Sequence, residues 1–181
     1  MKPILFNTEM VQAILSGQKT VTRRPIKPAP KSPLVCVSGK WLETQPCANG
    51  VRCIAPPYRP GDILYVRETW SPVFVRPKRY IYKADCNEVD PFLIQWHPSI
   101  HMPKEAARLF LRVKAVYAER LKEISASSAM DEGVTDWKNF VALWDSTIKT
   151  ADIPLDGWAA NPWVWVIEFE RISEHDNPEL V

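Results

Sequence analysis

The stretch that most constrains the fold lies between one glycine and one proline, Gly17 and Pro25. An apolar helical pattern precedes Gly17, and glycine ends a helix readily because it adopts the left-handed conformation without a Cβ clash. Proline has no backbone N–H group and therefore ends a strand. Residues 20–24 between them favour β-structure. We expect a helix, a tight turn and a short strand in immediate succession.

The stretch also gathers reactive side chains: Lys19, Thr22, Arg23 and Arg24. On a regular strand Thr22 and Arg24 share one face, and Lys19 and Arg23 share the other. Lys19 can therefore reach Thr22 only if it lies in the turn after Gly17. Two interpretations stay open at this point. The stretch is either an exposed strand with charged residues that protect its edge, or part of a catalytic site.

The catalytic interpretation has a clear chemical basis. A threonine hydroxyl is a poor nucleophile until a neighbouring base takes its proton. A lysine can be that base if desolvation and a nearby cation lower its pKa. Arg23 or Arg24 can supply the cation, or can hold a phosphate or a polarised carbonyl with two hydrogen bonds. A carboxylate is missing from the stretch itself.

Composition limits the class of protein. A chain of 181 residues with 46% apolar and 24% charged residues is typical of one globular domain. Its formal net charge of +2 is too small to bind a polyanion through bulk charge, so a nucleic-acid contact requires a local basic patch. No apolar run reaches membrane-spanning length, and we expect a cytoplasmic protein without a membrane partner. The sequence does not decide between a monomer and a dimer.

The four cysteines do not form a zinc motif. Cys36, Cys47, Cys53 and Cys86 lack the paired spacing of zinc ligands, and no histidine completes a pair with them at a familiar spacing. Because disulfides are rare in the cytosol, we expect free thiols. We therefore predict neither a metal nor another cofactor.

Short strands and short helices follow one another along the chain. Strand patterns lie at 4–6, Leu34–Val37, 40–42, 51–54, 63–66, 79–84, 109–116 and Trp163–Ile172. Helix patterns follow the N-caps Thr8, Ser125 and Thr135 and occupy 103–108. Eight prolines mark residues 25–60, which we interpret as an inserted flap. Without βαβ alternation, these patterns predict an α+β or small-barrel fold, with a polar tail at 173–181.

Three landmarks resemble the ASCH domain family: Gly17-x-Lys19-x-x-Thr22-x-Arg24 after a capped helix, the turn Pro60-Gly61-Asp62, and the strand VWVIEF at 164–169. The strings VRETW at 66–70 and SIHMP at 99–103 resemble the larger phage and prophage branch. The resemblance covers residues 1–24 and about 60–172. It implies a single domain at 1–172 with a PUA-like small β-barrel, flanking short helices and an association with RNA. The proline-rich insertion at about 25–60 is extra.

The same resemblance implies roles for individual residues. The family includes an amidohydrolase that removes the acetyl group from acetylcytidine with a threonine, a lysine and a glutamate. Its lysine and threonine match Lys19 and Thr22, and its next arginine matches Arg24. An ungapped alignment from Leu121 onward places its glutamate at Glu132. Without the family, Glu132 would be interpreted as a solvated residue of a last helical turn, where an acid is mildly unfavourable.

We therefore predict that Thr22 attacks an amide carbonyl, Lys19 accepts its proton, Glu132 assists and Arg24 positions an acylated nucleoside or base. Arg67, Glu68 and Trp70 are further pocket candidates. Arg67 and Glu68 can read a base edge or pair with each other, and Trp70 can stack a base or fill the core. Two alternatives remain. One is a non-catalytic reader of RNA or a modified nucleotide, and the other is a metal-independent ribonuclease in which Lys19 stabilises the phosphorane.

Overall fold

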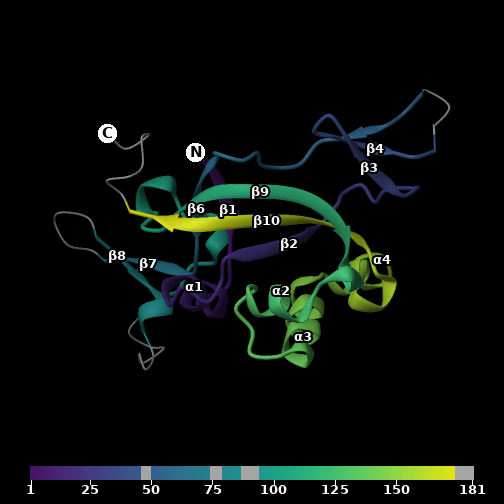
Figure 1. The fold of residues 1–181 in the computed structure, drawn as a ribbon. Helices are drawn as coiled ribbons and strands as arrows, with labels where there is room; N and C mark the ends of the chain where they lie inside the picture. Colours follow the sequence, from purple (N-terminus) through teal and green to yellow (C-terminus); the bar gives the residue numbers. More distant parts are fainter. Residues whose placement is uncertain (46–49, 74–78, 87–93, 174–181) are drawn as a thin grey trace. The chain divides into compact units, whose positions relative to one another are not determined.

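The computed structural model describes residues 1–45, 50–73, 79–86 and 94–173 (Figure 1). The chain forms two compact units that are interleaved in sequence. The first comprises Met1–Thr20, Gly61–Val113 and Phe169–Val181, and the second comprises Val21–Pro60 and Lys114–Glu168. Strands β9 (Phe110–Arg120) and β10 (Trp163–Ile172) belong to both units.

The first unit is built on the pairing of β1 (Lys2–Leu5) with β6 (Ile63–Arg67). These strands are parallel, and β6 pairs antiparallel with β9. The apolar side chains of this sheet are almost completely buried: Ile4, Leu64, Val66 and Leu111. Helix α1 (Thr8–Leu15) follows β1 and buries its apolar face. The hairpin of β7 (Trp70–Val73) and β8 (Arg79–Tyr82) completes the unit together with short 3-10 turns.

The second unit is built on β2 (Val21–Pro25), which pairs antiparallel with β10. Helices α2 (Ala126–Met130) and α3 (Trp137–Thr147) pack against these strands, and α4 (Ile153–Asp156) follows (Figure 1). One apolar cluster joins them: Val21, Leu121, Ile124, Ala129, Phe140, Trp144, Val164 and Val166. Because both faces of β10 are buried as far as Ile167, its sequence is apolar without a break from Trp163 to that residue.

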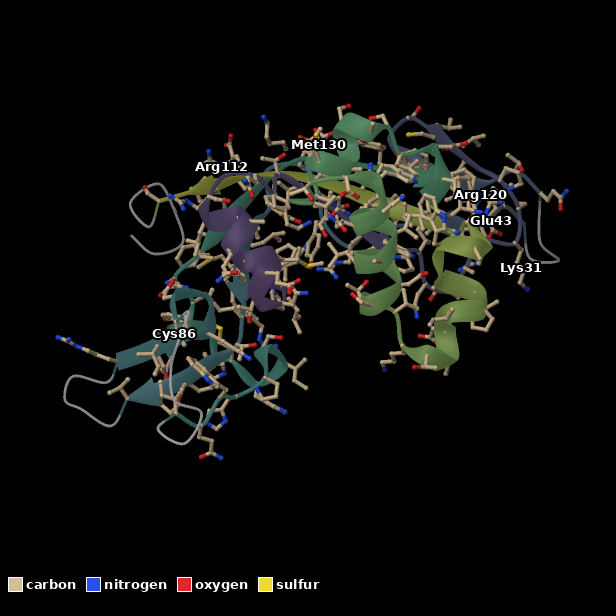
Figure 2. The ribbon with its side chains drawn as sticks, turned by 90° about the horizontal axis from the view of Figure 1, so that it is seen from below. Lys31, Glu43, Cys86, Arg112, Arg120 and Met130 are labelled. Carbon is tan, nitrogen blue, oxygen red and sulfur yellow. The ribbon has the colours of Figure 1, made fainter. Side chains whose placement is uncertain are left out.

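The proline-rich insertion forms a small sheet of its own within the second unit. Strands β3 (Leu34–Val37), β4 (Lys40–Glu43) and β5 (Cys53–Ile54) pair antiparallel in that order. The buried carboxylate of Glu43 accepts hydrogen bonds from the backbone N–H of Lys31 at 2.8 Å and from Arg52 at 3.3 Å. Glu43 and Lys31 are labelled in Figure 2. The insertion is therefore ordered by a buried charge as well as by strand pairing.

The sheets are open among the described residues. The largest has the order β1-β6-β9-β10-β2, and β7-β8 forms a two-stranded sheet. Strands and short helices without a repeated βαβ unit confirm the predicted α+β class. None of the described helices combines the length and apolar composition needed to cross a bilayer. Cys36, Cys53 and Cys86 are free thiols, and Cys47 lies outside the described residues.

Two helix starts differ from the sequence prediction by one residue. Asn7, not Thr8, caps α1, because its side-chain oxygen accepts the Met10 N–H at 2.8 Å. Asp136, not Thr135, caps α3 in the same way. Each observed cap has an extended backbone that directs its side chain toward an N–H three residues on. Adjacent residues that can both cap a helix are not distinguished by local sequence.

Two further boundaries differ from the sequence prediction. The expected helix at 103–108 is only the 3-10 turn Lys104–Ala106, and β9 continues to Arg120. Helix α2 begins at its predicted cap Ser125 but ends at Met130, before Glu132. Glu132 therefore follows the helix instead of belonging to its last turn.

Gly17 ends the first helical segment as predicted. Its φ is +79°, and its N–H donates to the carbonyl of Ile14 at 3.1 Å. A Cβ at this position would meet no atom within 4 Å. A substitution there is therefore disfavoured by backbone conformation alone.

We predict that Gly17→Ala lowers the free energy of unfolding by about 1 kcal/mol, because alanine is strained in the left-handed region. Gly17→Asn should cost less, since asparagine tolerates this conformation. Urea unfolding of the three proteins checks the order. Equal losses for alanine and asparagine would contradict the conformational explanation.

Candidate functional site

Lys19 lies between α1 and β2, where it forms a single β-bridge but belongs to no strand. Its backbone N–H donates to the carbonyl of Ala13 at 3.0 Å, which continues the turn begun at Gly17. Its side chain is only 2% exposed, and Nζ lies 5.7 Å from the centroid of the Phe6 ring. Lys19 therefore lies outside the strand, as the sequence argument required, and its side chain is buried.

Thr22 and Arg23 are buried on β2, at 2% and 4% exposure. The interpretation of this stretch as a solvated, charged strand edge is therefore wrong for these residues. Opposite Thr22 in the register lies Ile167 of β10, so the strand places a hydroxyl in a largely apolar setting.

The Arg23 guanidinium contacts three different segments of the second unit. Its Nε donates to Glu119 of β9 at 2.8 Å. Its Nη1 donates to Glu132 at 3.2 Å, and its Nη2 donates to the Ser128 hydroxyl of α2 at 2.7 Å. The arginine side chain is 1% exposed, and those of Glu132 and Glu119 are 5% and 18% exposed. This is a buried charge cluster, in which low polarity strengthens each interaction.

Backbone hydrogen bonds hold Glu132 beside β2. Its N–H donates to the carbonyl of Ala129 at 3.1 Å, which tightens the end of α2. The next residue back, Asp131, accepts the N–H of Val21 at 3.1 Å through its carbonyl. Glu132 is 4% exposed, so the interpretation that it is solvated is wrong. The cost of a buried carboxylate requires compensating partners, and Arg23 is one of them.

Arg24 is the second arginine near Glu132. Burial lowers the pKa of Arg24, while the charge of Glu132 and the phenol of Tyr58 act in the opposite direction. Tyr58 belongs to the proline-rich insertion, so this insertion contributes to the surroundings of Arg24. Nearby, burial together with the charges of Glu119 and Glu168 raises the pKa of Tyr117.

The structure distributes the predicted residues between the two units. Thr22, Arg24 and Glu132 belong to the second unit, and Lys19 belongs to the first with Arg67, Glu68 and Trp70. Sequence reasoning missed two residues of the charge cluster, Glu119 and Ser128. Their side chains are ordinary for a strand and a short helix, and no motif marks either of them.

Arg67 and Glu68 do not pair with each other. Arg67 donates to two backbone carbonyls, that of Met102 at 2.9 Å and that of Ile100. Glu68 is 1% exposed and accepts two hydrogen bonds from Arg108, from Nε at 2.9 Å and from Nη2 at 3.1 Å. Both side chains therefore fix the ends of loops in the first unit.

Arg108 links Glu68 to the aromatic hairpin. Its Nη1 donates to Asp85 at 2.5 Å, and its guanidinium carbon lies 4.0 Å from the Tyr82 ring centroid. Burial raises the pKa of Glu68 although Arg108 opposes this shift. Burial likewise raises the pKa of Tyr82 to about 12. For the pKa of Glu68, the effect of desolvation is thus larger than the opposing effect of the ion pair with Arg108.

Trp70 lies within an aromatic group and is half-buried. Its ring meets that of Tyr80 edge to face at 5.6 Å and lies 5.2 Å from that of His97. Its indole N–H is buried, and no described residue accepts a hydrogen bond from it. Trp70, Tyr80 and His97 thus pack together as a small aromatic core. That Trp70 stacks on a base stays a prediction.

No family model matches the chain, and no curated protein matches it. Among solved structures, the chain is similar to protein EF3133 from Enterococcus faecalis V583, which is described under the family model DUF984. The identity is 13% and the TM-score is 0.46. The match covers 95% of this chain and 81% of that one.

We predict that Arg108→Met lowers the free energy of unfolding by about 3–5 kcal/mol at pH 7, because it leaves the buried Glu68 carboxylate without its main partner. The matched control is Arg112→Met, which removes an exposed pair with Glu170 and should cost less than about 1 kcal/mol. Chemical unfolding of both variants makes the comparison.

The loss in Arg108→Met should shrink as the pH falls. Burial raises the pKa of Glu68, so the native state binds a proton before the unfolded state does. The free energy of unfolding of this variant should therefore rise as the pH is lowered into the range in which Glu68 protonates. A pH-independent loss would show that Glu68 is not the group responsible.

Proposed function

We propose that this protein is an amidohydrolase of the ASCH type, with a PUA-like fold, that acts on an acylated nucleoside or base such as acetylcytidine. The observation that carries the proposal is the setting of Thr22. This residue is buried on β2 directly before two arginines. Arg23 donates a hydrogen bond to the buried carboxylate of Glu132, and the charge of that carboxylate raises the pKa of Arg24 against the effect of burial. A nucleophile, cations and a carboxylate on adjoining segments match the requirements of covalent amide hydrolysis.

In the proposed first step, Thr22 Oγ1 attacks the carbonyl carbon of the substrate amide and its proton passes to the neutral amine of Lys19. The carbon–nitrogen bond then breaks, and the proton is delivered to the departing exocyclic amine of the base. An ester on Thr22 remains. In the second step, water attacks this ester, acetate leaves, and the threonine hydroxyl regains its proton.

Lys19 suits the role of the base because its side chain is desolvated and lies outside the strand that carries Thr22. Glu132 is proposed to orient the ammonium group of Lys19 or to serve the leaving amine. Arg24 is proposed to position the substrate, since a guanidinium can donate two hydrogen bonds to one polar group. The mechanism requires no metal.

One observation favours a different function, that of a non-catalytic reader of RNA or a modified nucleotide. One oxygen of Glu132 already accepts a hydrogen bond from Arg23, as a purely structural carboxylate would. A reader needs only a ligand that fits, and it would bind nucleic acid with a salt-dependent affinity and leave it intact. We place either activity in the cytoplasm, with a nucleoside or RNA as the ligand.

We expect Thr22→Ala to reduce cytidine release from acetylcytidine by about 1,000-fold or more, equivalent to ~4 kcal/mol of transition-state stabilisation. Chromatographic detection of cytidine measures the release. The matched control is Thr20→Ala, two residues away and exposed, which should retain the wild-type rate. Undiminished release by Thr22→Ala would rule out the nucleophile.

Lys19→Met keeps the length of the buried side chain and removes its amine. If Lys19 is the general base, kcat/KM for acetylcytidine should fall by about 100- to 10,000-fold. Incubation with labelled RNA and no divalent metal tests the ribonuclease alternative in parallel. RNA cleavage by the wild type that Lys19→Met loses, without acetylcytidine hydrolysis, would replace the proposal with that activity.

A further inference from the structure

Arg23 hydrogen-bonds to Glu132, and the family resemblance does not assign Arg23 to any role. Its three side-chain nitrogens donate to three partners on three segments: Glu119, Glu132 and Ser128. Only a guanidinium has donors arranged to reach all three at once, because a lysine presents a single charged nitrogen.

Stability alone does not account for this arrangement. A buried ion cluster is often no more stable than apolar side chains of similar volume, since desolvation offsets the attraction between the charges. A β-branched residue at this position of β2 would suit both the strand and the adjacent apolar cluster around Val21. The three hydrogen bonds do impose a defined geometry on the side chains that they join.

Arg23 fixes the orientation of the Glu132 carboxylate. Nη1 holds Oε1 of this carboxylate at 3.2 Å. Nε is anchored by Glu119 at 2.8 Å and Nη2 by Ser128 at 2.7 Å, so the guanidinium itself cannot rotate without losing a bond. The Ser128 contact also ties α2 to β2, and Glu132 lies two residues beyond the end of this helix. One side chain thus fixes both the backbone and the carboxylate of Glu132.

We propose that Arg23 is a positioning residue that holds the Glu132 carboxylate in its reactive orientation, with Glu119 and Ser128 as the anchors of its guanidinium. This inference rests on the proposed amide hydrolysis, in which Glu132 takes part. Arg23 does not contact the substrate in this scheme and acts only through Glu132.

The first test is Arg23→Lys, which keeps the charge and removes the three-way geometry. We expect kcat for acetylcytidine to fall by about 10- to 100-fold, as small displacements of catalytic groups do, while KM changes by less than about threefold. The matched control is Arg112→Lys, at an exposed arginine–glutamate pair, which should leave both constants unchanged. A wild-type kcat in a folded Arg23→Lys protein would overturn the inference.

Chemical rescue separates positioning from folding. Arg23→Ala opens a space lined by Glu119, Glu132 and Ser128 that methylguanidinium can occupy. Added methylguanidinium should restore kcat at least about tenfold in Arg23→Ala, since binding it again places donors beside Glu132. It should not restore Glu132→Gln or Thr22→Ala. Absence of rescue in a protein with native circular dichroism would count against positioning.

If Arg23→Ala does not fold, a pair of less disruptive variants tests the same inference. Ser128→Ala removes one anchor of the guanidinium and should lower kcat about threefold, because one of the three hydrogen bonds that hold the guanidinium is lost. Ser127→Ala, on the exposed face of the same helix, should have no effect. Equal kcat values for the two serine variants and the wild type would overturn the inference.

These outcomes also distinguish the inference from the function on which it rests. If the wild type does not hydrolyse acetylcytidine, the proposed function fails and the inference falls with it. If the wild type is active and Thr22→Ala is inactive, but every Arg23 and Ser128 variant keeps the wild-type kcat, only the positioning role fails.

Discussion

The buried guanidinium of Arg23 is the interaction on which the arrangement of the second unit depends. It lies on β2, bonds to Glu119 on β9 and to Ser128 on α2, and holds Glu132 just beyond that helix. Arg23 and Glu132 are thereby almost completely removed from water, and Glu119 is removed in part. Because an unpaired charge in such a place costs several kcal/mol, none of the three can move independently of the others.

A comparable arginine–carboxylate cluster organises the first unit. Glu68 accepts two hydrogen bonds from Arg108, which also contacts Asp85 and the Tyr82 ring. The two clusters differ in their chemistry. The Glu68 cluster contacts the aromatic hairpin through the Tyr82 ring, whereas the Arg23 cluster lies on the strand that also carries Thr22.

The sequence predicted local structure well where one residue type decides it. Gly17 ends the helical segment because it adopts a positive φ, and the Trp163–Ile172 pattern forms one long strand. It predicted less well where neighbours compete, as at Asn7 and Thr8. Glu132 became a candidate only through the family resemblance, since its own surroundings in sequence indicate a solvated residue.

The sequence by itself determined the α+β class, the order of the helix, turn and strand around Gly17, and the types of chemistry available there. These depend on backbone preferences that act over a few residues. Only the tertiary structure decided that Arg23 bonds to Glu132, 109 positions away, and that Glu119 and Ser128 complete the cluster. The reason is physical: ion pairs form where packing excludes water, and burial is a property of the folded chain rather than of any local stretch.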